Sequence, residues 1–211
     1  MTHLDGLYLI TPDTADNPDV LAEQVAQAIS GGARLVQYRN KGADQQLRRD
    51  QAIAVLGVCR AAGVPLVIND DVALAAEIGA DGVHLGREDG DPIAARRRLG
   101  ADAIIGVSCY DDMTLAQAAE RAGASYVAFG SFFPSATKPH AAWASLGLLS
   151  TARDSLRIPA VAIGGITPQN GGLLIAAGAR MLAVVTGVFA QPDLAAAARA
   201  YASLFVDGDP R

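Results

Sequence analysis

Short apolar segments alternate with longer amphipathic segments eight times along this chain of 211 residues. The apolar segments are continuous rather than alternating in polarity, which is typical of parallel strands buried on both faces. We expect strands at residues 6–12, 35–39, 65–69, 82–85, 104–108, 126–130, 160–163 and 181–185. We expect helices at about residues 18–30, 44–62, 72–78, 92–99, 113–122, 144–155, from 168 onward, and 194–205.

A recurring Gly-Ala pair supports this count. It stands before every second expected strand, at residues 32–33, 79–80, 123–124 and 178–179. A glycine at this place can end a helix in the left-handed conformation, and alanine lets the chain turn closely into the sheet. Four copies of a two-unit module of about fifty residues fit a closed (β/α)8 barrel. We therefore predict an α/β protein with a single compact TIM-barrel domain over residues 1–211, in which 207–211 form a flexible tail. An open doubly wound sheet is the alternative.

The charge balance and the cysteine content exclude several classes of protein. Seventeen basic against 22 acidic side chains give a net charge of −5, and the basic residues form no long cluster, so we expect no nucleic-acid binding. No apolar run reaches the roughly 18 residues of a membrane span, and the N-terminus lacks the pattern of a secretory signal. Two cysteines are too few for a disulfide framework. A cytoplasmic location is the simplest expectation.

A basic segment at the end of the second expected strand predicts an anion site. In a barrel, functional residues gather where strands end and loops begin. Gln37, Arg39 and Lys41 alternate along the segment 35–41, and alternate residues of a strand point to one face. Two cations brought together in a buried place require an anion to neutralise them. A phosphate or pyrophosphate is the expected ligand, and an edge strand with a solvated basic face is the alternative.

Acidic residues follow the third and fourth expected strands. Asp71 and Asp91 each stand directly before a helix and are well placed to cap it. Asp70 and Asp89 have no such capping duty and would lie on adjacent loops of one rim. Two carboxylates beside a phosphate site suggest Mg²⁺ bridging protein and phosphate oxygens. Helix capping by the whole group is the alternative interpretation.

A second anion site is expected on the opposite loops. Residues 131–143 form a long loop after the sixth strand, and Ser135–Lys138 within it carry hydroxyls and one lysine suited to gripping a phosphate. Gly164-Gly165 and Thr186-Gly187 end the last two strands, where barrels often bind phosphate through backbone N–H groups. Ordinary polar loops and tight turns are the alternatives. A substrate pair with one diphosphate and one monophosphate would fill both sites.

Three further residues lie at or near strand ends. Ser108 could hydrogen-bond a substrate or a neighbouring backbone group. We expect His84 to be a hydrogen-bonded core histidine rather than a catalyst. Cys109 has no base identifiable in the sequence, so nucleophilic catalysis is a weak hypothesis.

Together these motifs resemble the thiamine phosphate synthase family. The match runs in order along nearly the whole chain, and it comprises Tyr8–Thr11, Gln37-x-Arg39-x-Lys41, Asn69-Asp70-Asp71, Asp81–Gly86 with Asp89, Gly106-Val-Ser108, Gly130 through Lys138, Ala162–Ile166 and Val185-Thr186. No single motif is diagnostic, but the ordered set is specific. The resemblance implies a Mg²⁺-dependent transferase on a (β/α)8 barrel. It would join a hydroxymethylpyrimidine diphosphate to a thiazole phosphate and release pyrophosphate.

The resemblance also implies roles for individual residues. The pyrimidine diphosphate would be held by Gln37, Arg39, Lys41, Asn69, Ser108 and Lys138, with Tyr38 and Asn40 beside them. The thiazole phosphate would be held by Ser135, Ala136, Thr137, Gly165, Val185 and Thr186. Asp70 and Asp89 would ligate Mg²⁺, and Arg39, Lys41, Ser108 and Lys138 would carry the catalysis. Arg87 stands where the family commonly has glutamine, while Ser135 and Thr186 are mild departures that keep a hydroxyl.

The mechanism implied by the family requires no protein nucleophile. Pyrophosphate leaves the pyrimidine methylene, and the thiazole nitrogen captures the resulting carbocation. Two other activities stay open at this stage: a thiazole tautomerase on the same barrel, and a non-catalytic barrel that senses phosphate esters. The expected partners are the small-molecule substrates alone, without nucleic acid or membrane, and homo-oligomerisation is left open.

Overall fold

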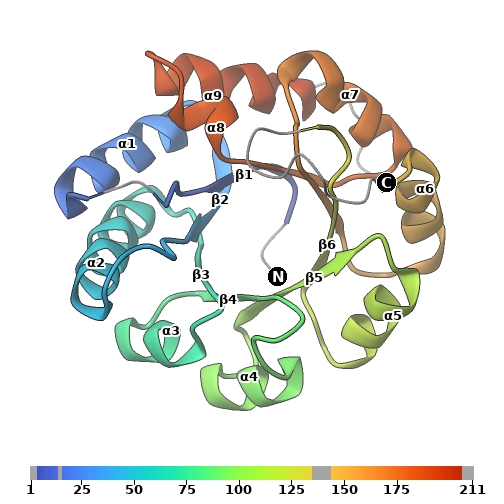
Figure 1. The fold of residues 1–211 in the computed structure, drawn as a ribbon, viewed down its shortest axis with the longest axis horizontal. Helices are drawn as coiled ribbons and strands as arrows, with labels where there is room; N and C mark the ends of the chain where they lie inside the picture. Colours follow the sequence, from blue (N-terminus) through green and yellow to red (C-terminus); the bar gives the residue numbers. More distant parts are fainter. Residues whose placement is uncertain (1–3, 14–15, 135–143, 206–211) are drawn as a thin grey trace.

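Eight parallel strands close into a barrel in the computed structural model, which describes residues 4–13, 16–134 and 144–205 (Figure 1). The strands are hydrogen-bonded in sequence order, and the first also pairs with the last. Figure 1 looks down the barrel and shows the helices as a ring around the strands. The predicted (β/α)8 barrel is therefore confirmed, and the open sheet is excluded. The expected tail at 207–211 lies outside the described residues.

The strands and helices alternate as the apolar segments predict. The strands are β1 (Gly6–Ile10), β2 (Ala33–Tyr38), β3 (Leu66–Asn69), β4 (Gly82–Leu85), β5 (Ile104–Tyr110), β6 (Tyr126–Phe129), β7 (Ala160–Ile163) and β8 (Met181–Val184). The helices are α1 (Pro18–Ser30), α2 (Gln45–Ala62), α3 (Val72–Ile78), α4 (Pro92–Leu99), α5 (Met113–Arg121), α6 (Leu146–Ser155), α7 (Pro168–Ala177), α8 (Thr186–Phe189) and α9 (Leu194–Ala202). A 3₁₀ turn, η1 (Ser203–Phe205), follows α9.

Most predicted boundaries are correct to within about two residues, and three other differences concern the strand ends where the site lies. Strand β2 ends at Tyr38, so Arg39 lies in the following loop and not on the strand. Strand β5 continues to Tyr110 through an irregular pairing with β6 between Ser108 and Tyr110. Helix α8 was not predicted, because its four residues are too few to show a helical period.

The predicted helix caps are present. Asn17 accepts the backbone N–H groups of the first turn of α1, Asp71 accepts the Leu74 N–H at 2.8 Å, and Asp91 accepts the Ile93 N–H at 3.0 Å. Gly79, the glycine of one Gly-Ala pair, ends α3 with φ 68° in the left-handed region. Capping thus accounts for Asp71 and Asp91 but not for Asp70 and Asp89.

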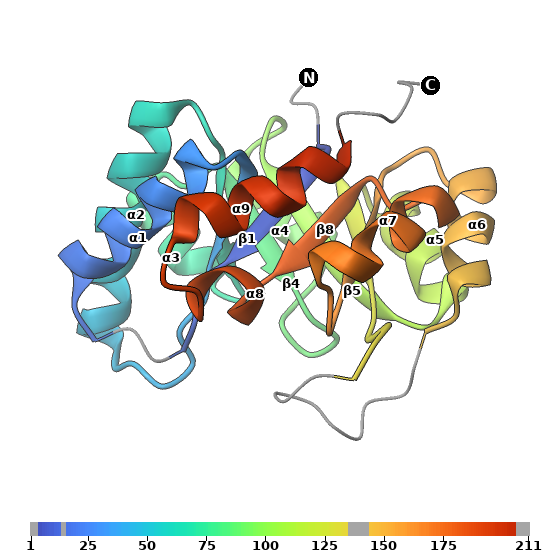
Figure 2. The same ribbon diagram turned by 90° about the horizontal axis from the view of Figure 1, so that it is seen from above.

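The apolar residues form two layers. An inner layer fills the barrel and includes Tyr8, Leu35, Tyr126 and Met181. An outer layer packs the strands against the helices, and both cysteines are buried there as free thiols. Within the described ranges, no helix is both long and apolar enough to cross a membrane. The loop after β4 and the described residues 130–134 after β6 leave the barrel on the same side, which Figure 2 shows edge-on.

Candidate active site

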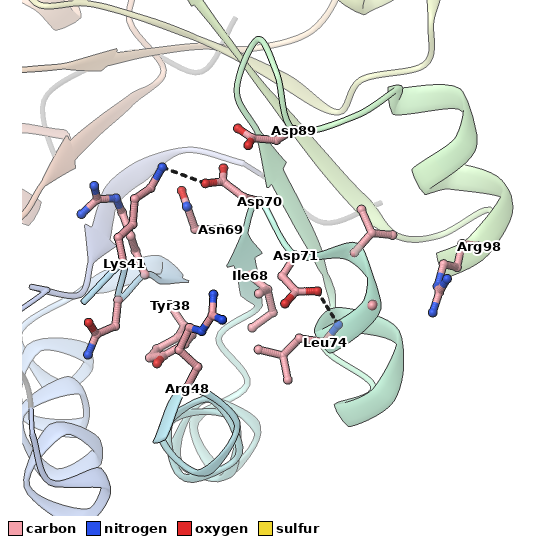
Figure 3. A pocket seen from close by; sticks show the side chains of 14 residues that line it. Tyr38, Lys41, Arg48, Ile68, Asn69, Asp70, Asp71, Leu74, Asp89 and Arg98 are labelled. Atoms are coloured by element: carbon pink, nitrogen blue, oxygen red, sulfur yellow. Dashed lines mark hydrogen bonds and ion pairs between the residues drawn. The ribbon is translucent and has the colours of Figure 1, made fainter. Parts of the chain in front are cut away.

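A cavity of about 660 Å³ opens where β2, β3 and β4 end. Predicted site residues from three successive loops line it, namely Tyr38, Arg39, Asn40, Lys41, Asn69, Asp70 and Asp89. Figure 3 shows Lys41 and Asp70 pointing toward each other, with Asp89 on the neighbouring loop. Arg48 of α2 also lines the cavity and was not predicted. The barrel therefore brings together the basic and acidic groups that are separate in the sequence.

Asp13, in the loop after β1, holds the basic loop in place. Its carboxylate accepts the Lys41 backbone N–H at 2.8 Å and pairs with the Arg39 guanidinium. Burial raises the pKa of Asp13, but the Lys41 N–H, the Arg39 hydrogen bond and both positive charges outweigh burial, so the pKa lies below its ordinary value. The strand alternation proposed for this segment is thus wrong beyond Tyr38. Contacts with Asp13 hold Arg39 and the Lys41 backbone instead.

Thr11, at the end of β1, adds a second link to the same loop. Its Oγ1 accepts the Arg39 backbone N–H at 2.8 Å and donates to the Arg39 carbonyl oxygen at 2.8 Å. The hydroxyl is fully buried. In the sequence, the only signal for a role of Asp13 is its position just after a strand end.

Tyr38 and Asn40 turn their polar atoms toward α2. The Tyr38 hydroxyl donates to Gln51 Oε1 at 2.8 Å, and Asn40 Nδ2 donates to the same oxygen at 3.1 Å. Asn40 Oδ1 also accepts the N–H groups of Gly42 and Ala43, each at 3.1 Å. Both side chains therefore shape the loop that carries Lys41, and a direct contact with substrate stays a prediction.

The carboxylates of Asp70 and Asp89 face each other from the loops after β3 and β4. Lys41 Nζ lies 2.9 Å from Asp70 Oδ2, and Asp89 Oδ2 accepts the Gly86 N–H at 3.0 Å. Burial, a hydrogen bond with Asp70 and the charge of Asp70 raise the pKa of Asp89, against the Gly86 N–H and Lys41. Asp70 has φ 63°, a backbone conformation that non-glycine residues rarely adopt and that is frequent at functional sites.

This pair fits a magnesium ion. Its donors are hard carboxylate oxygens, and their mutual repulsion is what a divalent cation would relieve. Among the described residues, no group of three or more His, Cys, Asp or Glu side chains could hold a metal. The remaining ligands would therefore be water and substrate phosphate oxygens, which is the usual arrangement for Mg²⁺.

Gln37 and Ser108 lie deeper, inside the barrel. Gln37 is 2% exposed and donates from Nε2 to the Tyr8 hydroxyl at 2.5 Å. Ser108 Oγ lies 2.9 Å from His84 Nε2. Burial lowers the pKa of His84 to about 4, although the charge of Asp70 opposes it, so the imidazole is neutral at pH 7. His84 is a hydrogen-bonded core histidine, as expected from the sequence.

The glycine-rich loop after β7 packs against the chain that follows β6. A Cβ atom at Gly165 would lie 2.5 Å from the Pro134 carbonyl oxygen and 2.6 Å from that of Phe133, and its φ is 64°. Val185 and Thr186 follow the adjacent strand β8, and Thr186 begins α8. Four predicted residues of the same site, Ser135, Ala136, Thr137 and Lys138, lie outside the described residues. The second anion site is thus described only in part.

Comparison with known proteins decides the family. A family model described as thiamine monophosphate synthase matches residues 7–188. The chain belongs to this family. A thiamine-phosphate synthase of Azoarcus sp. is 56% identical over 200 residues, which cover 95% of this chain and 97% of the relative. That of Chromobacterium violaceum is 56% identical over 202 residues, covering 96% and 97%.

A solved structure agrees with these relatives. The thiamine phosphate pyrophosphorylase from Pyrococcus furiosus superposes with a TM-score of 0.84 at 31% identity, covering 94% of each chain. The family, the transferase class and the thiamine-phosphate synthase activity expected from the motifs are therefore confirmed.

Two residues without a firm role from the sequence, Arg87 and Cys109, have defined surroundings in the structure. The Arg87 guanidinium lies 4.8 Å from the centre of the Tyr110 ring, so its charge rests on an aromatic face. Cys109 is buried, and burial together with the charge of Asp112 raises its pKa to about 12, so its thiol stays protonated. A buried, protonated thiol does not support Cys109 as a nucleophile.

Proposed function

We propose that this chain couples 4-amino-2-methyl-5-hydroxymethylpyrimidine diphosphate with 4-methyl-5-(2-phosphooxyethyl)thiazole to give thiamine phosphate and pyrophosphate. The observation that carries the proposal is the meeting of Arg39, Lys41, Asp70 and Asp89 around one cavity at the ends of the strands. Cations and carboxylates in one place suit a diphosphate that binds together with a divalent cation.

Asp70 and Asp89 would hold Mg²⁺. Bound there, the ion would neutralise charge on the diphosphate oxygens and so make pyrophosphate a better leaving group. The fit of the two carboxylates to this ion supports the assignment. Lys41, whose ammonium already contacts Asp70, would then pair with the diphosphate beside the metal.

The protein cations would stabilise the charge that builds on the leaving group. The bond between the pyrimidine methylene and the diphosphate oxygen breaks, and its electron pair leaves with pyrophosphate. The lone pair of the thiazole nitrogen then forms the new carbon–nitrogen bond. Arg39, Lys41 and, from the loop outside the described residues, Lys138 would supply the electrostatic stabilisation. Asn69, Gln37 and Ser108 would orient the pyrimidine end.

The thiazole phosphate would bind on the opposite loops. Gly165, Val185 and Thr186 follow two adjacent strands, and the close packing at Gly165 supports a loop whose backbone is fixed before the ligand arrives. Ser135, Ala136 and Thr137, which lie outside the described residues, would also hold the thiazole phosphate. The cytoplasmic location and any homo-oligomer stay predictions from the sequence.

One incubation tests the proposal. The purified protein is supplied with both substrates and Mg²⁺, and thiamine phosphate and pyrophosphate are measured together. Equal amounts of the two products are expected. Isomerised thiazole phosphate without coupling would indicate a tautomerase, and substrate binding without any product would indicate a sensing barrel. Either result would overturn the proposal.

A further inference from the structure

Five polar side chains from five strands form one continuous hydrogen-bond chain through the barrel. Gln37 Nε2 lies 2.5 Å from the Tyr8 hydroxyl, which lies 2.6 Å from the Tyr126 hydroxyl. The Tyr126 hydroxyl lies 2.9 Å from His84 Nδ1, and His84 Nε2 lies 2.9 Å from Ser108 Oγ. The chain therefore links two residues that are both assigned to the pyrimidine substrate, through three that have no assigned role.

The three linking side chains are closely packed and neutral. Tyr8 is 1% exposed and Tyr126 is fully buried, with their rings edge to face. The His84 and Tyr126 rings stack at an interplanar angle of 20°. Burial raises the pKa of both tyrosines, so both phenols keep their protons at pH 7.

Gly106 of β5 leaves the space that this chain needs. A Cβ atom there would lie 2.1 Å from Tyr126 Cζ and 2.2 Å from its hydroxyl oxygen. The glycine thus lets the Tyr126 ring lie over β5, so that its hydroxyl meets His84 of the neighbouring strand β4. The strand sequence Gly106-Val-Ser108 therefore provides both the gap and the last member of the chain.

The donors and acceptors give the chain a direction. An amide nitrogen can only donate, so the Tyr8 oxygen accepts from Gln37. Among the described residues, the Tyr126 oxygen is the partner within reach of the Tyr8 proton, which directs that proton to Tyr126. The Tyr126 proton then goes to His84 Nδ1, which must be unprotonated. A neutral imidazole of this kind carries its proton on Nε2 and donates it to Ser108. The Ser108 oxygen is thereby an acceptor toward His84, and its own proton is free to point away from His84.

We propose that Tyr8, Tyr126 and His84 are positioning residues, which hold the Ser108 hydroxyl as a hydrogen-bond donor toward the pyrimidine diphosphate. The inference rests on the proposed function for the identity of that substrate. The direction of the chain itself does not depend on any substrate.

The direction can be tested on the free protein by ¹⁵N NMR of the imidazole nitrogens. The chain has three histidines, and His84→Gln assigns the His84 signal by its loss. The Nε2–H tautomer is expected at pH 7. An Nδ1–H tautomer would mean that the chain runs the other way, with Ser108 donating inward, and would overturn the proposal even if the coupling activity is confirmed.

The effect on the reaction is tested by breaking the chain in its middle. Tyr126→Phe keeps the ring and removes the link, and we expect kcat to fall about tenfold with little change in the KM of the thiazole phosphate, because a misdirected donor stabilises the transition state less. Tyr201→Phe is the matched control, since the Tyr201 hydroxyl is also buried but bonds to the Ile166 carbonyl oxygen at 3.0 Å. It should retain the wild-type kcat.

Conservative replacement separates positioning from packing. His84→Gln can still donate to Ser108 and accept from Tyr126, whereas His84→Leu can do neither. We expect His84→Gln to retain several-fold more activity than His84→Leu at matched thermal stability. Equal activity of the two variants, or wild-type kcat in Tyr126→Phe, would overturn the positioning role. A wild-type protein without coupling activity would instead refute the proposed function and leave the NMR result standing.

Discussion

Lys41 Nζ lies 2.9 Å from Asp70 Oδ2, so the cation proposed for the diphosphate already contacts a carboxylate proposed for the metal. The lysine side chain is more than half exposed, and Asp70 is about one-quarter exposed. A pair of this exposure contributes little to stability. The Lys41–Asp70 ion pair therefore serves mainly to place both charges at the cavity before substrate and metal bind.

Lys41→Met keeps the length of the side chain and removes its charge. We expect kcat for the coupling reaction to fall about 100-fold, the scale typical for losing one group that stabilises transition-state charge. Steady-state kinetics at saturating Mg²⁺ measures it. Arg199→Ala, which removes an exposed cation on α9 away from the cavity, is the charge-matched control and should keep the wild-type rate. Similar rates in both variants would contradict the role of Lys41.

Asp13 should strengthen binding of the pyrimidine diphosphate, because it holds the Arg39 side chain and the Lys41 backbone in place. Asp13→Asn keeps an acceptor for the Lys41 N–H but loses the ion pair with Arg39, while Asp13→Ala loses both. We expect the KM of the pyrimidine diphosphate to rise in both, and more in the alanine variant. An alanine variant with the same KM as wild type would show that Arg39 and Lys41 are held without Asp13.

The sequence was sufficient to predict the barrel because its signals are local. Continuous apolar strands, helix caps such as Asp71, and repeated Gly-Ala turns each depend on neighbouring residues only. The prediction that the residues after β2, β3 and β4 lie together followed from one rule, that the strands of a parallel barrel all end on the same side. It correctly brought Lys41, Asp70 and Asp89 to one cavity.

The features that were missed depend on contacts between distant segments. Asp13 acts on a loop 28 residues away, and the hydroxyl bond between Tyr8 and Tyr126 spans 118 residues. Which side chains meet inside a closed barrel depends on the stagger of its strands, and a single sequence does not specify that stagger. The end of β2 at Tyr38 was missed for a similar reason, because Asp13 and Thr11 draw the following residues toward β1.

Gly106→Ala tests the space beside Tyr126. The added methyl would overlap the tyrosine ring, so we expect a loss of roughly 1–3 kcal/mol in the free energy of unfolding, as for other overpacked cores, together with reduced coupling activity. Gly57→Ala on α2 is the control, because a Cβ there meets no atom within 4 Å. That variant should gain about 0.5–1 kcal/mol from the better helix former. Urea unfolding of both variants is the measurement, and an unchanged Gly106→Ala protein would contradict the crowding.

The coupling reaction should require Mg²⁺, and Asp89 should determine the Mg²⁺ concentration at which the rate is half-maximal. We expect Asp89→Asn to raise the Mg²⁺ concentration for half-maximal rate by at least about tenfold, since even outer-shell changes at metal sites have effects of this size. Asp91→Asn removes a carboxylate from the same loop but keeps a good helix cap, so it should resemble wild type. Full activity in excess chelator would refute the metal requirement.

The buried imidazole of His84 should make the fold less stable in acid. Burial lowers its pKa to about 4 from an ordinary 6.5, so between these values the unfolded chain binds a proton that the folded protein does not. Stability from this group is therefore complete above pH 6.5 and is lost as the pH falls toward 4, by roughly 3 kcal/mol. His84→Gln has no such group, so the wild type should lose more free energy of unfolding than the variant between pH 7 and pH 4.5. Urea unfolding at several pH values measures both, and parallel pH profiles would mean that His84 takes up a proton without leaving the fold.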